Sequence, residues 1–279
     1  MPELPEVETV RLDLVRDVVG RTIVAADVTG RRTVRRQDPA AFTAALASRR
    51  VESVGRHGKY LFARLDDASA LVAHLRMSGS LQLVAGGAGV GREPHTHVVL
   101  ALDDGSELRF VDPRTFGELF VTADVAPDGR PHALAALGVD PLLDPLDASI
   151  VRELVGRRRT ALKAMLLDQR AIAGVGNIYG DEICFRARLR PDRRTESVSA
   201  GEASRLAGAV VDVLTEAVAA RGSTLRDARY RDLRGGHGEY QHRHAVYGRA
   251  GEPCPRCGRA VERVRIAGRS SFLCPACQR

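Results

Sequence analysis

The chain has 279 residues, of which 44% are hydrophobic and 28% charged, a composition typical of a folded globular protein and not of a disordered or fibrous one. No run approaches the roughly 18 apolar residues of a membrane-spanning helix, and the acidic, proline-containing start is unlike a signal peptide, so we expect a cytoplasmic protein with no membrane partner. The 42 Lys and Arg outnumber the 35 Asp and Glu, which favours a polyanionic partner.

The first residues contain a candidate nucleophile. Removal of Met1 would leave Pro2 with a secondary amine at the chain end, where the pKa starts at about 7.7–8.0, well below that of lysine. Because such an amine has no nitrogen proton left to lose after condensing with a carbonyl carbon, the product is a cationic iminium, a strong electron sink. Glu3 could donate or accept a proton beside it. The alternative is an ordinary frayed terminus, with Glu3 only complementing a helix dipole.

A helix is predicted to follow directly and to end at Gly20. Pro5 suits its first turn, and Glu6 and Glu8 suit the positive end of its dipole. Its apolar residues recur at helical spacing and are Val7, Val10, Leu14 and Val18. Pro2 would then lie near a helix N-terminus, where positive potential disfavours a protonated amine.

Short strands are predicted over most of the remaining front half. They are Thr22–Thr29, Lys59–Leu65, Leu71–His74, Ser80–Val84, Val98–Leu102, Glu107–Val111 and Leu119–Val121. Asp103-Asp104-Gly105 is a hairpin signal between two of them. Because no helix of normal length interrupts these strands, we expect an antiparallel sandwich or barrel with a helix packed on it.

The prolines of residues 123–147 predict a linker, and after it the apolar residues change to helical spacing. Helices are then predicted at Ile150–Val155, Thr160–Asp168, Ile178–Phe185 and Ala200–Ala220. Between the second and third, Gly174 and Gly176 would let backbone N–H groups form an anion-binding concavity, although the same glycines could simply make a tight loop.

A basic stretch follows the last of these helices. Its arginines stand among glycines and three histidines, and they include Arg226, Arg229, Arg231, Arg234 and Arg243. Such a run is either a solvated loop or a mobile lid over a polyanion.

The last segment carries the strongest local motif. Cys254-Pro-Arg-Cys257 and Cys274-Pro-Ala-Cys277 are separated by 16 residues, 258 to 273, a spacing typical of a four-cysteine zinc ribbon. Four thiolates complete a zinc tetrahedron and leave no open position for a reacting water, so the predicted cofactor is one structural Zn²⁺. Cys184 lies in an apolar helix and is predicted to be a buried spectator.

Further motifs stand between these features. They are Pro2-Glu3-Leu4-Pro5-Glu6-Val7-Glu8-Thr9, Gly58-Lys59-Tyr60-Leu61, His74-Leu75-Arg76-Met77-Ser78-Gly79, Asp112-Pro113-Arg114-Thr115-Phe116-Gly117, Gly174-Val175-Gly176-Asn177-Ile178-Tyr179, Tyr247-Gly248-Arg249 and Gly268-Arg269. In this order they resemble the bacterial formamidopyrimidine-DNA glycosylase family, from Pro2 to Gln278.

The resemblance implies an α+β protein with three domains. These are an N-terminal antiparallel β-sandwich with a packed helix (1–130), a helix–two-turn–helix domain (149–235) after a linker (131–148), and a four-cysteine zinc ribbon (236–279). It also implies damaged double-stranded DNA as the partner, bound by a monomer that associates with the bacterial nucleoid through that DNA.

The resemblance further implies catalytic roles. Pro2 would attack C1′ of the damaged nucleotide and Glu3 would protonate the sugar ring oxygen. Lys59 would contact the lesion phosphate and assist β-elimination, and Arg269 would bind phosphate and assist δ-elimination.

The resemblance also implies DNA contacts. A base inside a duplex must be flipped out, and Met77, Arg114 and Phe116 would fill the gap. Without the family, Met77 and Phe116 would be interpreted as core residues. The positions matched to backbone contacts are His95, Arg114, Arg159 and Asn177.

The expected function is therefore that of a DNA glycosylase and AP lyase for oxidised purines, 8-oxoguanine and formamidopyrimidines. One alternative is an endonuclease VIII-like preference for oxidised pyrimidines, although the Pro-Glu-Gly-Asp opening of those enzymes is absent. Others are a catalytically silent damaged-DNA binder and a tautomerase using its N-terminal proline as a base. The chain departs from the family at Thr115, at Ser271 and in Arg229–His244, which lacks the customary Gly-Tyr-Phe pattern of the damaged-base lid.

Overall fold

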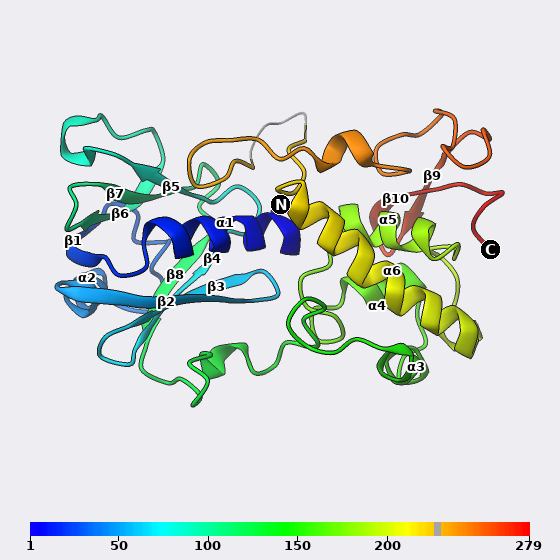
Figure 1. Cartoon of the computed structure of the whole chain (residues 1–279), viewed down its shortest axis with the longest axis horizontal. Coiled ribbons are helices and arrows are strands. Elements are labelled where there is room, and N and C mark those ends of the chain that lie inside the picture. Colours follow the sequence, from blue (N-terminus) through cyan, green and yellow to red (C-terminus); the bar gives the residue numbers. More distant parts are fainter. Residues whose placement is uncertain (226–229) are drawn as a thin grey trace. The chain divides into compact units, whose positions relative to one another are not determined.

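The computed structural model describes residues 1–225 and 230–279 and divides them into two compact units (Figure 1). The first unit contains Met1–Ala135 and Arg221–Gly238, and the second contains Ala136–Ala220 and Glu239–Arg279. Within the described ranges, no helix has both the length and the apolar character that crossing a bilayer requires. Arg226 and Arg229, two of the arginines of the basic stretch, lie outside the described residues.

The predicted first helix is confirmed as α1, Leu4–Asp17. Glu3 and Glu6 form a capping box at its start, in which the backbone N–H of Glu3 donates to the Glu6 carboxylate at 2.8 Å. Pro5 lies in the first turn, where its missing N–H costs no helical hydrogen bond. The apolar positions at helical spacing are buried against the sheet.

The described residues of the first unit contain eight strands, which form two four-stranded antiparallel halves. Their bounds are β1 Thr22–Val28, β2 Arg49–His57, β3 Tyr60–Leu65, β4 Ala70–His74, β5 Ser80–Val84, β6 Thr96–Leu102, β7 Glu107–Val111 and β8 Glu118–Thr122. The strands follow one order, β5-β7-β6-β1-β2-β3-β4-β8, in which the first four form one half and the last four the other. In the part of the chain that the structure describes, β1 pairs with β2 at Thr22–Arg50 and Ile23–Arg49, which joins the halves.

The two halves pack face to face and enclose the core. Residues of both, together with α1, surround one small apolar cavity of about 40 Å³. Leu14 comes from α1, Leu100 from β6, and Leu61 and Leu119 from β3 and β8. The predicted antiparallel β-sandwich with a packed helix is therefore confirmed.

Sequence periodicity missed one helix and one strand in this unit. The short helix α2, Pro39–Leu46, is capped by the Asp38 side chain and buries Phe42 and Leu46, one turn apart. Strand β2 escaped prediction because its pairing with β3 shifts register between Val51 and Ser53, which breaks the alternation of apolar and polar residues.

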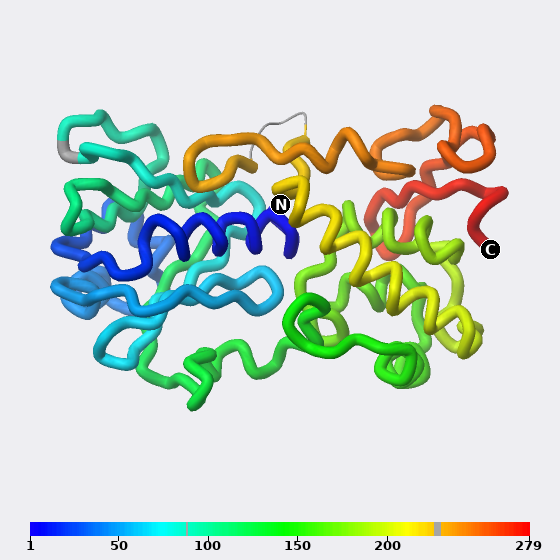
Figure 2. Tube along the Cα trace, viewed as in Figure 1, coloured from blue at the N-terminus to red at the C-terminus, as the bar shows by residue number. Residues whose placement is uncertain are grey.

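Residues 221–238 return to the first unit after the last long helix (Figure 2). Tyr230 and Leu233 join the sandwich core, and the backbone N–H of Leu83 donates to the Leu233 carbonyl at 2.9 Å. Arg221 binds Asp13 on α1 at 2.6 Å. Buried apolar side chains thus fix the described part of this segment to the sandwich.

The second unit contains the four predicted helices and a hairpin. The helices are α3 Ala148–Gly156, α4 Leu162–Leu167, α5 Asn177–Arg186 and α6 Ala200–Ala219, and the hairpin strands are β9 Glu262–Ile266 and β10 Arg269–Leu273. Four 3₁₀ turns complete the described chain, at Gly87–Gly89, His132–Leu134, Thr195–Ser197 and Tyr240–Arg243. Ser199 and Glu202 form a capping box that starts α6.

A buried ion pair ties the hairpin to the helices. Lys163 on α4 lies 2.8 Å from Asp181 on α5, and both side chains are almost fully buried. Asp181 also accepts hydrogen bonds from the Ser271 hydroxyl and from the backbone N–H of Phe272, both on β10. Removing one member of such a pair leaves a buried charge uncompensated, so the contact fixes the hairpin firmly.

Candidate functional site

The N-terminal residues lie at the start of α1. Met1 is half exposed, whereas Pro2 and Glu3 are buried. The Glu6 carboxylate holds this end in place, because it accepts hydrogen bonds from the backbone N–H groups of Glu3, at 2.8 Å, and Ser223, at 2.7 Å. A side chain at Gly222 would meet Glu6 Oε1 at 2.6 Å. The segment at 222–223 therefore packs directly against the helix start.

Lys59 occupies the tight turn between β2 and β3. Gly58 before it has a φ of +56°, and Lys59 is only 6% exposed. The fully buried Arg56 side chain donates to the Gly58 carbonyl at 3.0 Å and to Glu8 of α1 at 2.8 Å. Burial raises the pKa of Glu8, but hydrogen bonds from Arg11 and Arg56 outweigh it and lower that pKa. Arg56 thus fastens the Lys59 turn to the helix that begins with Pro2 and Glu3.

A neutral histidine lies in cationic surroundings next to this turn. The rings of His74 and Tyr60 pack edge-on, with 4.3 Å between their centres. Nδ1 of His74 accepts a hydrogen bond from the backbone N–H of Arg76 at 2.9 Å. Burial, together with the charges of Arg76, Lys59 and Arg35, lowers the pKa of His74 to about 3. Of these cations, Arg35 is also paired with the Glu118 carboxylate at 3.4 Å.

The residues predicted to fill the gap in DNA lie on two loops of the same unit. Met77 is 42% exposed and Phe116 is 40% exposed, so neither is the core residue that its type alone suggests. The Arg114 guanidinium lies 4.8 Å from the centre of the Phe116 ring. The structure therefore brings Arg114 and Phe116 together on the surface, where cation–π contact orders them.

The turn between α4 and α5 in the second unit is held by the side chain of Gln169. Gly174 has a φ of +97°, and the side chain of Gln169 bonds the Gly174 N–H and the Val175 carbonyl, both at 2.9 Å. Asn177 opens α5, and its side-chain oxygen is buried without a hydrogen-bond partner in the described structure. Gln169 takes up the Gly174 N–H, so an anion-binding concavity ahead of α5 stays a prediction. Arg159 is exposed in the same unit.

Arg269 follows the sharp turn between β9 and β10. Ala267 and Gly268 both have positive φ, at +46° and +80°, and Arg269 begins the return strand. Its exposed side chain lines a cleft of about 260 Å³ with Lys163 and Asp168. The buried Lys163–Asp181 pair lies directly beneath the strand that carries it.

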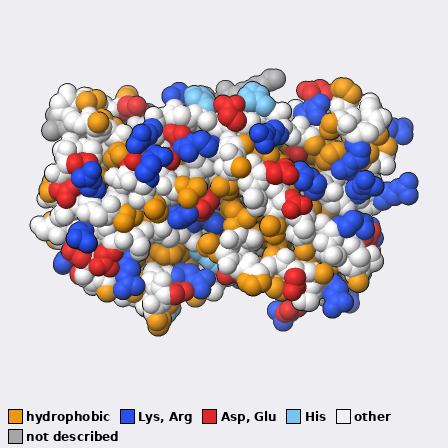
Figure 3. All heavy atoms as spheres, in the orientation of Figure 1, with side chains coloured by type: hydrophobic (Ala, Val, Ile, Leu, Met, Phe, Trp, Pro, Cys, Tyr) orange, Lys and Arg blue, Asp and Glu red, His pale blue; other side chains and the backbone are white. Residues whose placement is uncertain are grey.

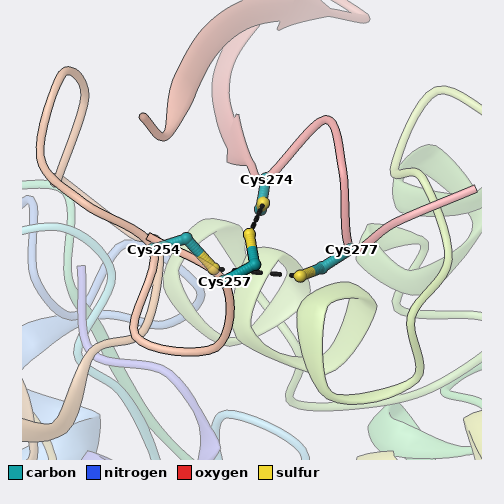
Figure 4. Close-up of side chains that lie close together, drawn as sticks. All are labelled: Cys254, Cys257, Cys274 and Cys277. Carbon is teal, nitrogen blue, oxygen red and sulfur yellow. Dashed lines mark hydrogen bonds between the residues drawn. The ribbon is translucent and has the colours of Figure 1, made fainter. Parts of the chain in front are cut away.

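The four predicted zinc cysteines converge on one point (Figure 4). Their sulfur atoms all lie within 4.8 Å of one another, with 4.0 Å between Cys254 and Cys277 and 3.4 Å between Cys257 and Cys274. Tetrahedral zinc with Zn–S bonds of about 2.3 Å requires sulfurs about 3.8 Å apart, so the residues fit this ion. The site is structural, because four thiolates fill the tetrahedron. Cys184 is buried elsewhere, and burial raises the pKa of its thiol.

Comparison with known proteins covers nearly the whole chain. Residues 1–119 match the formamidopyrimidine-DNA glycosylase N-terminal domain, residues 137–229 the formamidopyrimidine-DNA glycosylase H2TH domain, and residues 251–279 a zinc finger found in FPG and IleRS. Formamidopyrimidine-DNA glycosylases from Herpetosiphon aurantiacus and Geobacillus kaustophilus are 43% and 44% identical over 100% of both chains. The chain belongs to the formamidopyrimidine-DNA glycosylase family.

Solved structures of family members share the fold. The MutM (FPG) protein from Thermus thermophilus is 42% identical, with a TM-score of 0.86 over 99% of this chain and 98% of that one. The Lactococcus lactis Fpg (MutM) in complex with DNA containing N7-benzyl-Fapy-dG is 32% identical, with a TM-score of 0.90 over 100% of both chains.

Sequence reasoning missed several residues that shape these sites. Glu6 was interpreted only as a dipole partner, although its position three residues after Glu3 matches capping-box spacing. Asp112 directly precedes Pro113, and an Asp-Pro pair is typical of a turn in which the aspartate bonds nearby backbone N–H groups. Nothing in the sequence marked Arg56, because β2 was not predicted and an arginine is usually exposed to solvent. On the face shown in Figure 3, basic side chains are interspersed with acidic ones, so charge alone marks no single site there.

Zinc content tests the cysteine cluster. We expect about one zinc per chain in the purified protein, and its loss in Cys274→Ala, because three thiolates hold the ion far less tightly. The matched variant Cys184→Ala removes a buried cysteine outside the cluster and should retain the metal. Elemental analysis of the dialysed proteins gives the answer. Equal zinc in the two variants would contradict the assignment.

The pH dependence of stability tests the environment of His74. Its folded pKa of about 3 lies below the ordinary 6.5, so the unfolded chain binds more protons between these values. The resulting stabilisation is complete above pH 6.5 and is lost as pH falls, by up to about 1.4 kcal/mol per pH unit. His74→Asn keeps a hydrogen-bond acceptor but cannot titrate. In urea unfolding, its plot of unfolding free energy against pH should be less steep than that of wild type between pH 6 and 4, by the contribution of one proton. The exposed control His242→Asn should keep the wild-type slope, and identical slopes in all three proteins would exclude a buried neutral His74.

Proposed function

We propose that this chain is a bifunctional DNA glycosylase and AP lyase of base-excision repair that removes oxidised purines, 8-oxoguanine and formamidopyrimidines, from duplex DNA. The observation that carries the proposal is the placement of Pro2 and Glu3 at the capped start of α1, in a chain that matches glycosylases over its whole length. We also propose that it acts as a monomer in the bacterial cytoplasm, on the DNA of the nucleoid.

Pro2 acts as the nucleophile once Met1 has been removed. Its nitrogen bonds to C1′ of the damaged nucleotide while the bond from C1′ to the base breaks. Glu3 donates a proton to the sugar ring oxygen as the ring opens, which leaves an iminium between Pro2 and C1′. The iminium acidifies the C2′ proton, so the 3′ phosphate and then the 5′ phosphate can leave. Hydrolysis then releases Pro2.

Phosphate binding is assigned to two basic sites, one in each unit. Lys59 contacts the lesion phosphate and assists β-elimination, which is supported by the cations around His74. Arg269 binds phosphate and assists δ-elimination, which is supported by its exposed position at the hairpin turn. Zinc takes no chemical part, and the ion contributes folding free energy to the ribbon that carries Arg269.

The remaining candidate residues hold the DNA. Met77, Arg114 and Phe116 fill the gap left by the flipped nucleotide, which is supported by their exposure. The positions assigned to the DNA backbone are His95, Arg114, Arg159 and Asn177. The buried, unpartnered side-chain oxygen of Asn177 supports a polar ligand at the start of α5.

The purine preference is supported by relatives. Structures of the Lactococcus lactis Fpg contain Fapy-dG DNA or DNA with an abasic site. An endonuclease VIII-like preference remains the second candidate, because the described lid segment differs from the customary pattern. Faster single-turnover excision of thymine glycol than of 8-oxoguanine or formamidopyrimidine, with the opposite base varied, would favour that second candidate.

Borohydride trapping tests the role of Pro2. We expect wild-type protein to become covalently linked to abasic-site DNA in the presence of borohydride, and Pro2→Gly to give far less adduct, because its primary amine forms a weaker electron sink. Pro5→Gly is the matched control, since it removes a nearby proline, in the first turn of α1, and should trap as wild type does. Equal trapping by Pro2→Gly and wild type would refute the assignment. No trapping by any of the three would indicate a catalytically silent binder.

A further inference from the structure

The loop between β7 and β8 contains a fully buried carboxylate, Asp112. Its Oδ1 accepts hydrogen bonds from the Ser78 hydroxyl at 2.5 Å and from the backbone N–H of Arg114 at 3.2 Å. Its Oδ2 accepts from the backbone N–H of Gly117 at 2.6 Å. One side chain therefore joins the loop that carries Met77 to the loop that carries Arg114 and Phe116.

The backbone of Asp112 reaches a third loop. Its N–H donates to the His95 carbonyl at 3.0 Å, and its carbonyl lies 2.8 Å from Nε2 of His97. His95 is exposed just before β6 and is one of the proposed DNA-backbone contacts. Asp112 thus contacts three loops, and each of them presents a proposed DNA-binding side chain.

Each of these loops contains a residue in a disfavoured backbone conformation. Arg76, His95 and Thr115 have φ values of +54°, +67° and +54°. A residue with a Cβ atom rarely adopts this region and stays there only where its surroundings hold it. Arg76 directly precedes Met77, and Thr115 lies between Arg114 and Phe116. The strained positions are therefore next to the side chains that would enter DNA.

Two glycines beside the carboxylate are closely packed. A Cβ atom at Gly117 would lie 2.4 Å from the Phe110 ring and 3.0 Å from Asp112 Oδ2. One at Gly79 would lie 2.5 Å from the Leu75 carbonyl and 2.8 Å from the same ring. Both loops are thus packed against Phe110, with the carboxylate between them. A second brace holds the far side, where Arg35 donates to the Phe116 carbonyl at 3.2 Å.

We propose that Asp112 is a positioning residue for nucleotide flipping, which holds Met77, Arg114 and Phe116 in one arrangement before DNA arrives. The inference rests on the proposed function and names the device that prepares the gap-filling side chains. All three are exposed and, if their loops moved independently, would have to be ordered during insertion at an entropic cost. The hydrogen bonds of Asp112 remove that cost, because they fix both loops in the free protein.

Fluorescence of 2-aminopurine tests the proposal without requiring any chemistry at Pro2. The probe is a duplex with a non-cleavable tetrahydrofuran residue and 2-aminopurine opposite it. Saturating wild-type protein should change the fluorescence as side chains enter the stack. Asp112→Asn and Ser78→Ala should slow this change by about 10- to 100-fold, the usual consequence of a small misplacement of positioned groups.

Ser69→Ala is the matched control for Ser78→Ala. Both serines are 7% exposed, and each hydroxyl donates to an aspartate, Ser69 to Asp67 at 2.6 Å. The control should insert into the probe duplex at the wild-type rate. A second measurement uses a single-stranded abasic oligonucleotide, which has no gap to fill. With saturating protein, the trapped yield on it should stay within about twofold of wild type for all variants, because Pro2 forms the proposed bond to the sugar and a single strand has no gap for the loops to fill.

Two results would overturn the inference. One is insertion at the wild-type rate by both Asp112→Asn and Ser78→Ala. The other is an equal fall in duplex insertion and single-strand trapping, which would indicate general damage to the fold. Should Asp112→Asn fail to fold, Ser78→Ala carries the test, because it removes a single hydrogen bond. If the wild-type protein inserts rapidly and the two variants insert slowly, but none of them is trapped, the role of Pro2 is refuted and the role of Asp112 is supported.

Discussion

The start of α1 is fixed by one buried carboxylate, and the proposed chemistry depends on it. Glu6 binds the backbone N–H groups of Glu3 and Ser223, which are 220 positions apart in the chain. Its Oε2 therefore caps the helix, while its Oε1 anchors the segment after α6. Because Pro2 directly precedes Glu3, this contact sets where a terminal amine would lie, and Arg56 then ties the turn of Lys59 to the same helix.

Buried carboxylates recur wherever this fold must hold a loop. Asp112 joins the loops of the first unit, Asp181 fixes the β10 strand, and Glu182 accepts from three consecutive backbone N–H groups at 245–247. A buried carboxylate is costly unless its oxygens are satisfied. Each of these accepts from a distant segment: Asp112 from Ser78, Asp181 from Phe272 and Glu182 from Val246. Such contacts specify one loop arrangement more sharply than apolar packing, which tolerates small displacements.

Much of the fold followed from local sequence patterns, and less of the site did. Helical spacing predicted α1 and α6, and the cysteine spacing predicted the zinc centre, because both signals repeat at fixed intervals along the chain. Strand β2 was missed because a bulge breaks its alternation. Residue type alone would have buried Phe116, and only the family motif placed it on the surface. The anchoring roles of Arg56 and Asp112 depend on partners distant in sequence, so no local pattern could reveal them.

The central claim is that the imino terminus of Pro2 itself bonds to the sugar. The most direct measurement is peptide mapping by mass spectrometry of the borohydride-reduced adduct, after digestion of both the DNA and the protein. The account predicts that the sugar remnant is carried on the terminal nitrogen of a peptide that begins with Pro2 and lacks Met1. A remnant on Lys59, or an active protein whose first peptide still contains Met1, would contradict it.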